Sequence, residues 1–241
     1  MTIDELTALA EKGDAEAQCK LGYRYKKGIG VRKSFSKAVE WYTKAAEQGH
    51  ADAQNNLGIC YQYGYGVRKN YKKAVMWYTK AAEQGSDKAQ YHLGDCYENG
   101  LGVEKDLVKA VEWYTKAAIQ GDMSAQYALA LCYGKSKGVE KDLRQSVKWY
   151  LKAANQGDPW AQNNLAICYE RGEGVRKNYK KAIEWYTNAA KQENVMAQYN
   201  LAECYELGRG VKKDIEKAVE WYTKAAEQGD QAAKKRLLSL L

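Results

Sequence analysis

A stretch of twelve residues, AVEWYTKAAEQG at 38–49, returns almost unchanged at 74, 110, 146, 182 and 218. The spacing is 36 residues each time, so the chain carries six copies of one unit. A period of this length is typical of stacked helical hairpins, in which each unit buries its apolar face only against its neighbours. The repeat therefore predicts an all-α solenoid of helix-turn-helix units and argues against a globular enzyme.

The phase of the repeat divides the chain. Residues 1–13 match the second half of a unit and are predicted to form an N-terminal capping helix, while residues 230–241 restart a first helix and are predicted to cap the other end. The six full units between the caps are predicted at 14–49, 50–85, 86–121, 122–157, 158–193 and 194–229. All of them are expected to form a single solenoid over 1–241.

Each unit is predicted to contain two amphipathic helices, because its small and apolar residues recur at helical spacing. In the unit at 50–85, Gly64 and Gly85 stand where the two helices should end, since glycine readily takes the left-handed conformation that closes a helix. Asn70 is the predicted N-cap of the second helix. The tryptophan of the second helix, Trp77 in this unit, is predicted to pack between repeats.

Two units depart from this pattern of glycines at the helix ends. Ser136 replaces the first loop glycine of the fourth unit, and Gly134 stands earlier than in the other units, so the first helix of that unit is predicted to end early or to kink. Glu193 replaces the closing glycine of the fifth unit, so a residue other than glycine must end that helix.

Five of the six cysteines recur at the repeat spacing, namely Cys60, Cys96, Cys132, Cys168 and Cys204. Equivalent positions in neighbouring hairpins lie roughly 10 Å apart, which exceeds the reach of a disulfide. These cysteines are therefore predicted to be reduced thiols in the core. Cys19 is out of phase with them and aligns with Asn55, so it is expected to be exposed, and its reactivity is left open.

The N-terminus, MTIDELTALAEKGD, contains acidic residues and no apolar run of signal-peptide length, and no later segment is apolar for the length of a membrane span. We therefore expect a cytoplasmic, monomeric protein without membrane insertion, although secretion that needs no such signal stays open. The net charge of +8 favours acidic partners or nucleic acid by long-range attraction.

The pattern A-x-A-Q-x-x-L-G, then Y, then G-x-G-V, then K-A-V-E-W-Y-x-K-A-A-E-Q-G resembles the Sel-one-like repeat, a relative of the tetratricopeptide repeat. The resemblance covers essentially the whole chain. It implies a right-handed superhelix of antiparallel helix pairs that serves as a protein-interaction scaffold in signalling, protein quality control or contacts between bacterium and host. One branch of the family has two disulfide-bonded cysteines per repeat, and this chain, with one in phase, matches that branch poorly.

In related tetratricopeptide proteins the first helices line a concave groove that binds a protein or peptide. The first-helix positions that a helical wheel turns away from the core vary between units of this chain, while the scaffold barely changes. The candidate binding residues at these positions are Tyr23, Asn55, Tyr63, Tyr91, Asp95, Glu98, Tyr127, Trp160, Glu170, Arg171, Tyr199 and Glu203. The best anchors are Tyr91, Tyr127, Trp160 and Tyr199, because aromatic hot spots contribute roughly 2 kcal/mol or more each. The alternative is that the residues at these exposed positions vary between units because nothing constrains them, without any role in binding.

Two further features of the predicted groove concern polar residues. Asn56, Asn164 and Asn200 occupy a position that in the related family can bind a peptide backbone, and a hydrogen bond to the neighbouring hairpin is an equal alternative. Four carboxylates, Glu98, Glu170, Glu203 and Glu206, are expected to make parts of the groove acidic and to favour a ligand with basic residues.

Nucleic acid is the alternative partner. Basic pairs such as Arg32–Lys33, Arg68–Lys69 and Arg176–Lys177 recur in the second loops and could follow a phosphate backbone. Acidic residues in the third and fourth units, such as Glu104 and Asp106, interrupt this stripe. The near identity of the repeats also leaves open a consensus-like designed scaffold without a natural ligand.

Signals for catalysis are weak. The G-x-G sequences follow helices, lack the third glycine of a dinucleotide fingerprint and recur as helix ends. Ser34 and Lys37 match a Ser-x-x-Lys motif, but its companion motifs are missing and Ser34 is explained as an N-cap. The chain has two histidines, His50 and His92, and no carboxylate or cysteine at metal-ligand spacing. We therefore expect no enzyme activity, no cofactor and no metal.

Overall fold

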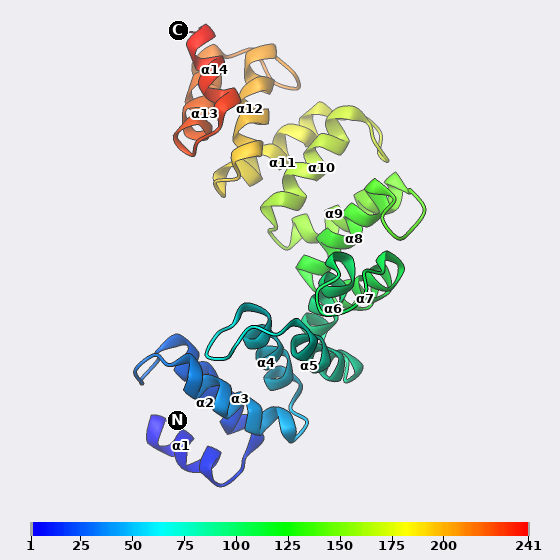
Figure 1. The fold of residues 1–241 in the computed structure, drawn as a ribbon. Coiled ribbons are helices and arrows are strands. Elements are labelled where there is room, and N and C mark those ends of the chain that lie inside the picture. Colours follow the sequence, from blue (N-terminus) through cyan, green and yellow to red (C-terminus); the bar gives the residue numbers. More distant parts are fainter. Residues whose placement is uncertain (1, 241) are drawn as a thin grey trace. The chain divides into compact units, whose positions relative to one another are not determined.

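The computed structural model describes residues 2–240 and is helical throughout, with fourteen helices and no strand in that range (Figure 1). The first helices of the six repeats are α2 (Ala15–Lys27), α4 (Ala51–Tyr63), α6 (Asp87–Asn99), α8 (Met123–Lys135), α10 (Pro159–Arg171) and α12 (Val195–Leu207). The second helices are α3 (Phe35–Glu47), α5 (Tyr71–Glu83), α7 (Leu107–Gln120), α9 (Leu143–Asn155), α11 (Tyr179–Lys191) and α13 (Ile215–Glu227). The predicted all-α fold is confirmed.

A further helix lies at each end of the chain. Helix α1 (Ile3–Glu11) falls within the N-terminal cap predicted at 1–13, and α14 (Gln231–Leu240) falls within the cap predicted at 230–241. Residues 1 and 241 of these two predictions lie outside the described part of the chain. Helix α1 packs against α2, and α14 packs against α13, so each terminal helix covers the end of a stack.

The chain divides into two compact units, one that ends at Asp122 and one that begins at Met123. We call them unit 1 and unit 2 and describe each by itself. Within each unit, every first helix packs against the second helix of its own repeat, and that second helix packs against the next first helix. This order of contacts is that of a solenoid. One solenoid over the whole of 1–241 stays a prediction.

Equivalent residues of successive repeats occupy equivalent places in the hydrophobic core. A tyrosine of each second helix is fully buried in five repeats, at Tyr42, Tyr78, Tyr114, Tyr186 and Tyr222. The ring of Tyr78 lies directly against Gly58 of the first helix. A β-carbon added at Gly58 would come within 2.5 Å of that ring, so only glycine fits there without a shift. Trp77 packs into the apolar cluster of the preceding repeat, as predicted for the tryptophans.

The predicted helix ends are confirmed where glycine and asparagine mark them. Gly64 closes α4 with a φ of 77°, and its amide donates a hydrogen bond to the Cys60 carbonyl. Asn70 caps α5 by accepting the Lys73 amide at 3.0 Å. Ser34 likewise caps α3, which gives this serine a structural role.

The prediction that the first helix of the fourth repeat ends early was wrong. Helix α8 runs to Lys135 and has thirteen residues, as each of the other five first helices does, so it does not end early. Ser136 itself adopts a left-handed φ of 54° in place of the missing glycine, and its hydroxyl donates to the Val139 carbonyl at 3.2 Å. Glu193 follows the end of the second helix of the fifth repeat and adopts a left-handed φ of 63°. The prediction that a residue other than glycine ends this helix is therefore confirmed.

Replacing Glu193 with glycine is expected to raise the free energy of unfolding by about 0.5–1 kcal/mol. A left-handed φ is strained for a residue with a β-carbon, whereas glycine takes it freely. Chemical denaturation monitored by circular dichroism measures the change. The matched control is Glu184→Gly at an exposed position inside α11, which should lose about 1 kcal/mol. Equal losses in both variants would contradict the strain at Glu193.

All six cysteines are free and buried, so the predicted core thiols are confirmed. The expectation that Cys19 is exposed was wrong, because only 8% of its surface is accessible. Burial raises the pKa of the Cys19 thiol to about 12, with Asp52 and Glu16 adding to the shift. Burial thus favours the thiol form of Cys19 over the thiolate, which is the nucleophilic form.

Candidate functional site

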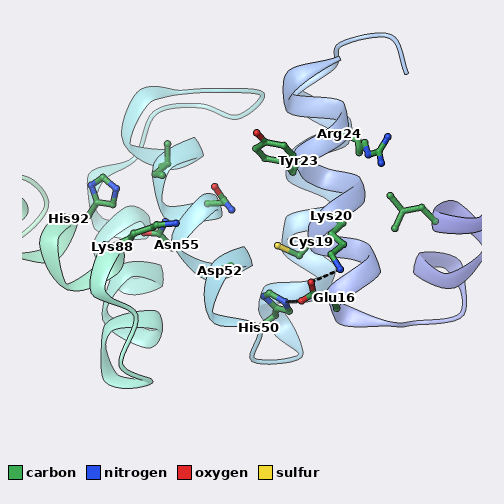
Figure 2. A pocket seen from close by; sticks show the side chains of 13 residues that line it. Glu16, Cys19, Lys20, Tyr23, Arg24, His50, Asp52, Asn55, Lys88 and His92 are labelled. Atoms are coloured by element: carbon green, nitrogen blue, oxygen red, sulfur yellow. Dashed lines mark hydrogen bonds and ion pairs between the residues drawn. The ribbon is translucent and has the colours of Figure 1, made fainter. Parts of the chain in front are cut away.

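Unit 1 contains a pocket of about 630 Å³ whose walls come mainly from the first helices α2, α4 and α6, with Leu6 of α1 and the N-cap residue His50. Figure 2 shows Tyr23 and Cys19 of α2 facing Asn55 of α4, with His92 of α6 beyond them. The other lining residues are Leu6, Glu16, Lys20, Arg24, His50, Asp52, Asn56, Ile59 and Lys88. Three successive repeats thus contribute to one pocket of the size that holds a small ligand or a few residues of a peptide.

One corner of this pocket is fixed by a chain of polar contacts around Glu16. The Glu16 carboxylate lies 2.9 Å from the Lys20 ammonium and 2.7 Å from His50 Nε2 (Figure 2). Hydrogen bonding from His50, and then from Lys20, lowers the pKa of Glu16. His50 Nδ1 accepts the Ala53 amide at 3.3 Å, so Nε2 carries the proton that is donated to Glu16.

Two cations of the pocket are unpaired. Among residues 2–240, the structure records no ion pair for Lys88 or Arg24, although both line the pocket. In Figure 2, Lys88 lies beside Asn55, whereas Arg24 points away from it. The set of candidate residues drawn from the sequence omits both. The sequence could have indicated Arg24, because this residue stands where the other repeats have the core cysteine.

The candidate residues of unit 1 differ in exposure. Tyr23 is 46% exposed and lines the pocket, while Tyr63 is 55% exposed and stacks on Tyr65 with ring centroids 5.6 Å apart. Asn55 lines the pocket but is only 5% exposed. The helical wheel that turned Asn55 away from the core was therefore wrong about its burial.

The other three candidates of unit 1 form a partly buried group on α6. The Glu98 carboxylate accepts the Tyr114 hydroxyl at 2.8 Å, and the Asp95 carboxylate accepts Asn99 Nδ2 at 2.8 Å. Burial, and then the charge of Glu98, raises the pKa of Asp95. The Tyr91 ring lies 5.8 Å from that of Tyr114, and burial raises the Tyr91 pKa to about 12.

In unit 2, Trp160 is the most accessible aromatic candidate, with 49% of its surface exposed. Arg171 is also exposed and lies 3.7 Å from Glu173. Tyr127 and Tyr199 are half-buried and lie against the rings of Tyr150 and Tyr222.

The carboxylates of unit 2 are held by arginines of the same chain. Arg209 lies 3.1 Å from Glu170 and 3.5 Å from Glu203, and all three line a cavity of about 440 Å³. Glu206 is 6% exposed and accepts hydrogen bonds from Tyr222 and Arg236. Arg209 and Arg236 thus offset part of the negative charge expected of the groove, while Glu98, the fourth of these carboxylates, accepts the neutral Tyr114 hydroxyl.

The asparagines of unit 2 bond to neighbouring hairpins. Asn200 Nδ2 donates to Asn163 Oδ1 at 3.1 Å, and Asn164 Nδ2 lies 3.4 Å from the hydroxyls of Tyr127 and Tyr150. Asn56 of unit 1 differs from them. It lines the pocket, and the structure shows no side-chain hydrogen bond for it within the described residues.

Lysines of the second loops lie over aromatic rings. The ammonium of Lys33 is 5.0 Å from the ring centre of Phe35, and those of Lys69 and Lys177 are 4.6 and 4.7 Å from Tyr71 and Tyr179. Cation–π contacts of this kind give the lysines a partner within the chain.

No group of three or more histidine, cysteine, aspartate or glutamate side chains within 2–240 could hold a metal ion. Within the same range, no helix combines the length and the apolar character needed to cross a membrane.

The model of the Sel1 repeat matches this chain six times, at residues 15–50, 51–86, 87–122, 124–158, 161–194 and 195–230. Together the matches take in nearly all of the sequence between the two terminal helices. A comparison with curated proteins gives no match.

Solved structures similar to this chain include three bacterial proteins. A protective antigen of uropathogenic Escherichia coli with an SLR fold has 39% identity and a TM-score of 0.93, over 98% of this chain but only 51% of its own. A Sel1 repeat protein of Oxalobacter formigenes has 40% identity and a TM-score of 0.80, over 91% of this chain and 88% of its own. An immunity protein of Pseudomonas aeruginosa has 25% identity and a TM-score of 0.53, over 88% and 81%. The chain thus spans about half the length of the E. coli antigen.

Proposed function

This chain belongs to the Sel1 repeat family, and from that premise we propose that it binds a protein or an extended peptide along the face formed by its first helices. Sel1 repeat proteins commonly act as protein-interaction scaffolds, and the family is generally non-catalytic. The observation that carries the proposal is the pocket of unit 1, to which α2, α4 and α6 each contribute side chains. A ligand that follows this pocket would contact successive repeats.

The pocket is suited to binding because it is already formed. Its helices are fixed by fully buried residues such as Leu21, Leu57 and Tyr78, so little order must be gained when a ligand binds. Tyr23 offers an exposed aromatic ring, and Asn55 and Asn56 offer amide groups. Aromatic rings supply contact area and amides can recognise a peptide backbone, so the lining fits a polypeptide.

A photo-crosslinking experiment tests the proposal. A photoreactive aromatic amino acid is placed at Tyr23 or at Trp160, and the full chain is irradiated in a lysate of the native cells. We expect covalent adducts with protein at one or both positions. The control is the same amino acid at Met76, which is 44% exposed on the second helix α5. Protein adducts of equal yield at Met76, or adducts with nucleic acid alone, would contradict binding at the first helices.

A further inference from the structure

The tryptophan of the second helix carries a lysine ammonium over its ring in five of the six repeats. The lysine stands three residues after the tryptophan, one turn further along the helix. The pairs are Trp41 with Lys44 at 4.2 Å from the ring centroid, Trp77 with Lys80 at 4.6 Å, Trp113 with Lys116 at 4.0 Å, Trp149 with Lys152 at 4.4 Å and Trp221 with Lys224 at 4.1 Å. At such distances the negative face of the indole attracts the cation. Each of these rings thus has a cation of its own helix as partner.

The fifth repeat lacks this cation. Asn188 stands at the lysine position of α11, and among residues 2–240 no ammonium or guanidinium group is recorded over the Trp185 ring. The residue before Trp185 is Glu184, which is exposed and has no recorded ion pair or hydrogen bond of its carboxylate in that range. An amide at position 188 therefore leaves both the ring and the carboxylate without a cation.

The sixth repeat shows how one cation contacts both groups. The Lys224 ammonium lies 2.6 Å from the Glu220 carboxylate and 4.1 Å from the centroid of the Trp221 ring. Glu220 and Trp221 are the equivalents of Glu184 and Trp185. A glutamate followed by a tryptophan on a second helix therefore has the geometry to hold a single ammonium group between them.

The framework around the two tryptophans is the same. Helices α11 and α13 each have thirteen residues, and Trp185 and Trp221 are both half-buried. In both repeats the next tyrosine is fully buried and bonds to a first-helix glutamate at 2.8 Å, and the glutamine after the second helix bonds to a first-helix glutamine at 2.9 Å. These contacts fix the second helix on its partner in the same way, so Trp185 and Glu184 are presented as Trp221 and Glu220 are.

We infer that Trp185 and Glu184 form a binding site for a basic side chain of a partner protein. The cation of that side chain takes the position that Lys224 has in the sixth repeat, over the indole ring and beside the carboxylate. Arginine is favoured over lysine, because its planar guanidinium stacks on an aromatic ring and can donate to a carboxylate at the same time. The site lies on a second helix, outside the first-helix face of the proposed function, and adds a second contact with protein.

The test is a nuclear magnetic resonance titration of the full chain, with the indole N–H signals of its seven tryptophans as readout. The probe is N-acetylarginine amide, and the matched neutral probe is N-acetylglutamine amide. The Trp185 signal, assigned with a Trp185→Phe variant, is expected to move and to saturate at millimolar arginine probe. The Trp221 signal should move at least about threefold less, because Lys224 already covers that ring.

Two substitutions exchange the properties of the fifth and sixth repeats. Asn188→Lys supplies the fifth repeat with its own cation, so the shift of the Trp185 signal at a fixed probe concentration should fall about threefold or more. Lys224→Asn removes the cation of the sixth repeat, so the Trp221 signal should now move as the Trp185 signal does in the wild type. The control is Glu216→Gln, which makes the same charge change as Asn188→Lys at an exposed position of α13 and should leave the Trp185 response unchanged.

Three outcomes would overturn the inference. These are a Trp185 signal that does not respond to the arginine probe, an equal response to the neutral probe, and an unchanged response in Asn188→Lys. Circular dichroism of each variant shows that a lost response is not a lost fold. Binding at the first helices is tested separately by the crosslinks at Tyr23 and Trp160, so either proposal can fail while the other stands.

Discussion

Replacing Tyr186 with alanine is expected to lower the free energy of unfolding by about 3–5 kcal/mol, the range for a large aromatic residue removed from a core. Tyr186 is fully buried, and its hydroxyl donates to Glu170 at 2.8 Å. The variant therefore loses the ring contacts, leaves a cavity between α10 and α11, and removes the donor to Glu170. Chemical denaturation monitored by circular dichroism measures the loss.

The phenylalanine variants separate the hydroxyl from the ring. Tyr186→Phe keeps the ring and removes a hydrogen bond to a carboxylate, so a loss of about 1.5–3 kcal/mol is expected. Tyr42→Phe is the matched change in the first repeat, where the hydroxyl has no partner, and no loss is expected. Equal losses in both variants would show that the Tyr42 hydroxyl is as well bonded as that of Tyr186.

The fold could be predicted because the helix boundaries of each repeat are determined by capping residues close to them in the sequence. Glycine at Gly64 and an amide at Asn70 act through the backbone within a few residues, and these effects do not depend on distant contacts. Ser136 shows the limit of such rules. A serine is uncommon at positive φ, yet here its hydroxyl bonds to the Val139 carbonyl and α8 keeps its full length.

The candidate site could be predicted only in part, because a helical wheel describes one helix at a time. It places Tyr23 and Trp160 on exposed surface, where the structure has them. It fails for Asn55, which is only 5% exposed and lines the same pocket as His92 of the following repeat. Burial at such a position depends on what the next repeat carries, and the wheel does not include the neighbour.

The charge of the first-helix face was missed for a related reason. Arg209 pairs with Glu170, which lies 39 residues earlier, and Arg236 with Glu206, 30 residues earlier. Neither distance equals the repeat period, so neither pair is visible when equivalent positions are aligned. The absence of a partner for the Tyr42 hydroxyl could in principle be predicted, because Lys26 stands where four repeats have the acceptors Gln62, Glu98, Glu170 and Glu206, and the fourth repeat has Gly134. That reading required knowing which tyrosine those acceptors serve.

Replacing Glu206 with alanine is expected to cost about 2–3 kcal/mol of unfolding free energy. The Glu206 carboxylate is buried, accepts the Tyr222 hydroxyl at 2.8 Å and accepts two nitrogens of Arg236, which comes from the terminal helix α14. Its loss leaves a buried hydroxyl without an acceptor and loosens α14. The control is Glu220→Ala, whose exposed pair with Lys224 should change stability by less than about 0.5 kcal/mol.

The same carboxylate should make stability depend on pH. Hydrogen bonds from Arg236 lower the pKa of Glu206 in the folded protein below its ordinary value of 4.5, and Tyr222 adds to this. A lowered pKa means that the stabilisation is complete above 4.5 and is lost as the pH falls through the folded value. Glu206→Gln keeps an acceptor for Tyr222, as Gln62 does for Tyr78, but does not titrate. Denaturation at a series of pH values should therefore show a shallower acid loss for Glu206→Gln than for the wild type, and parallel curves would mean that Arg236 does not hold Glu206 ionised.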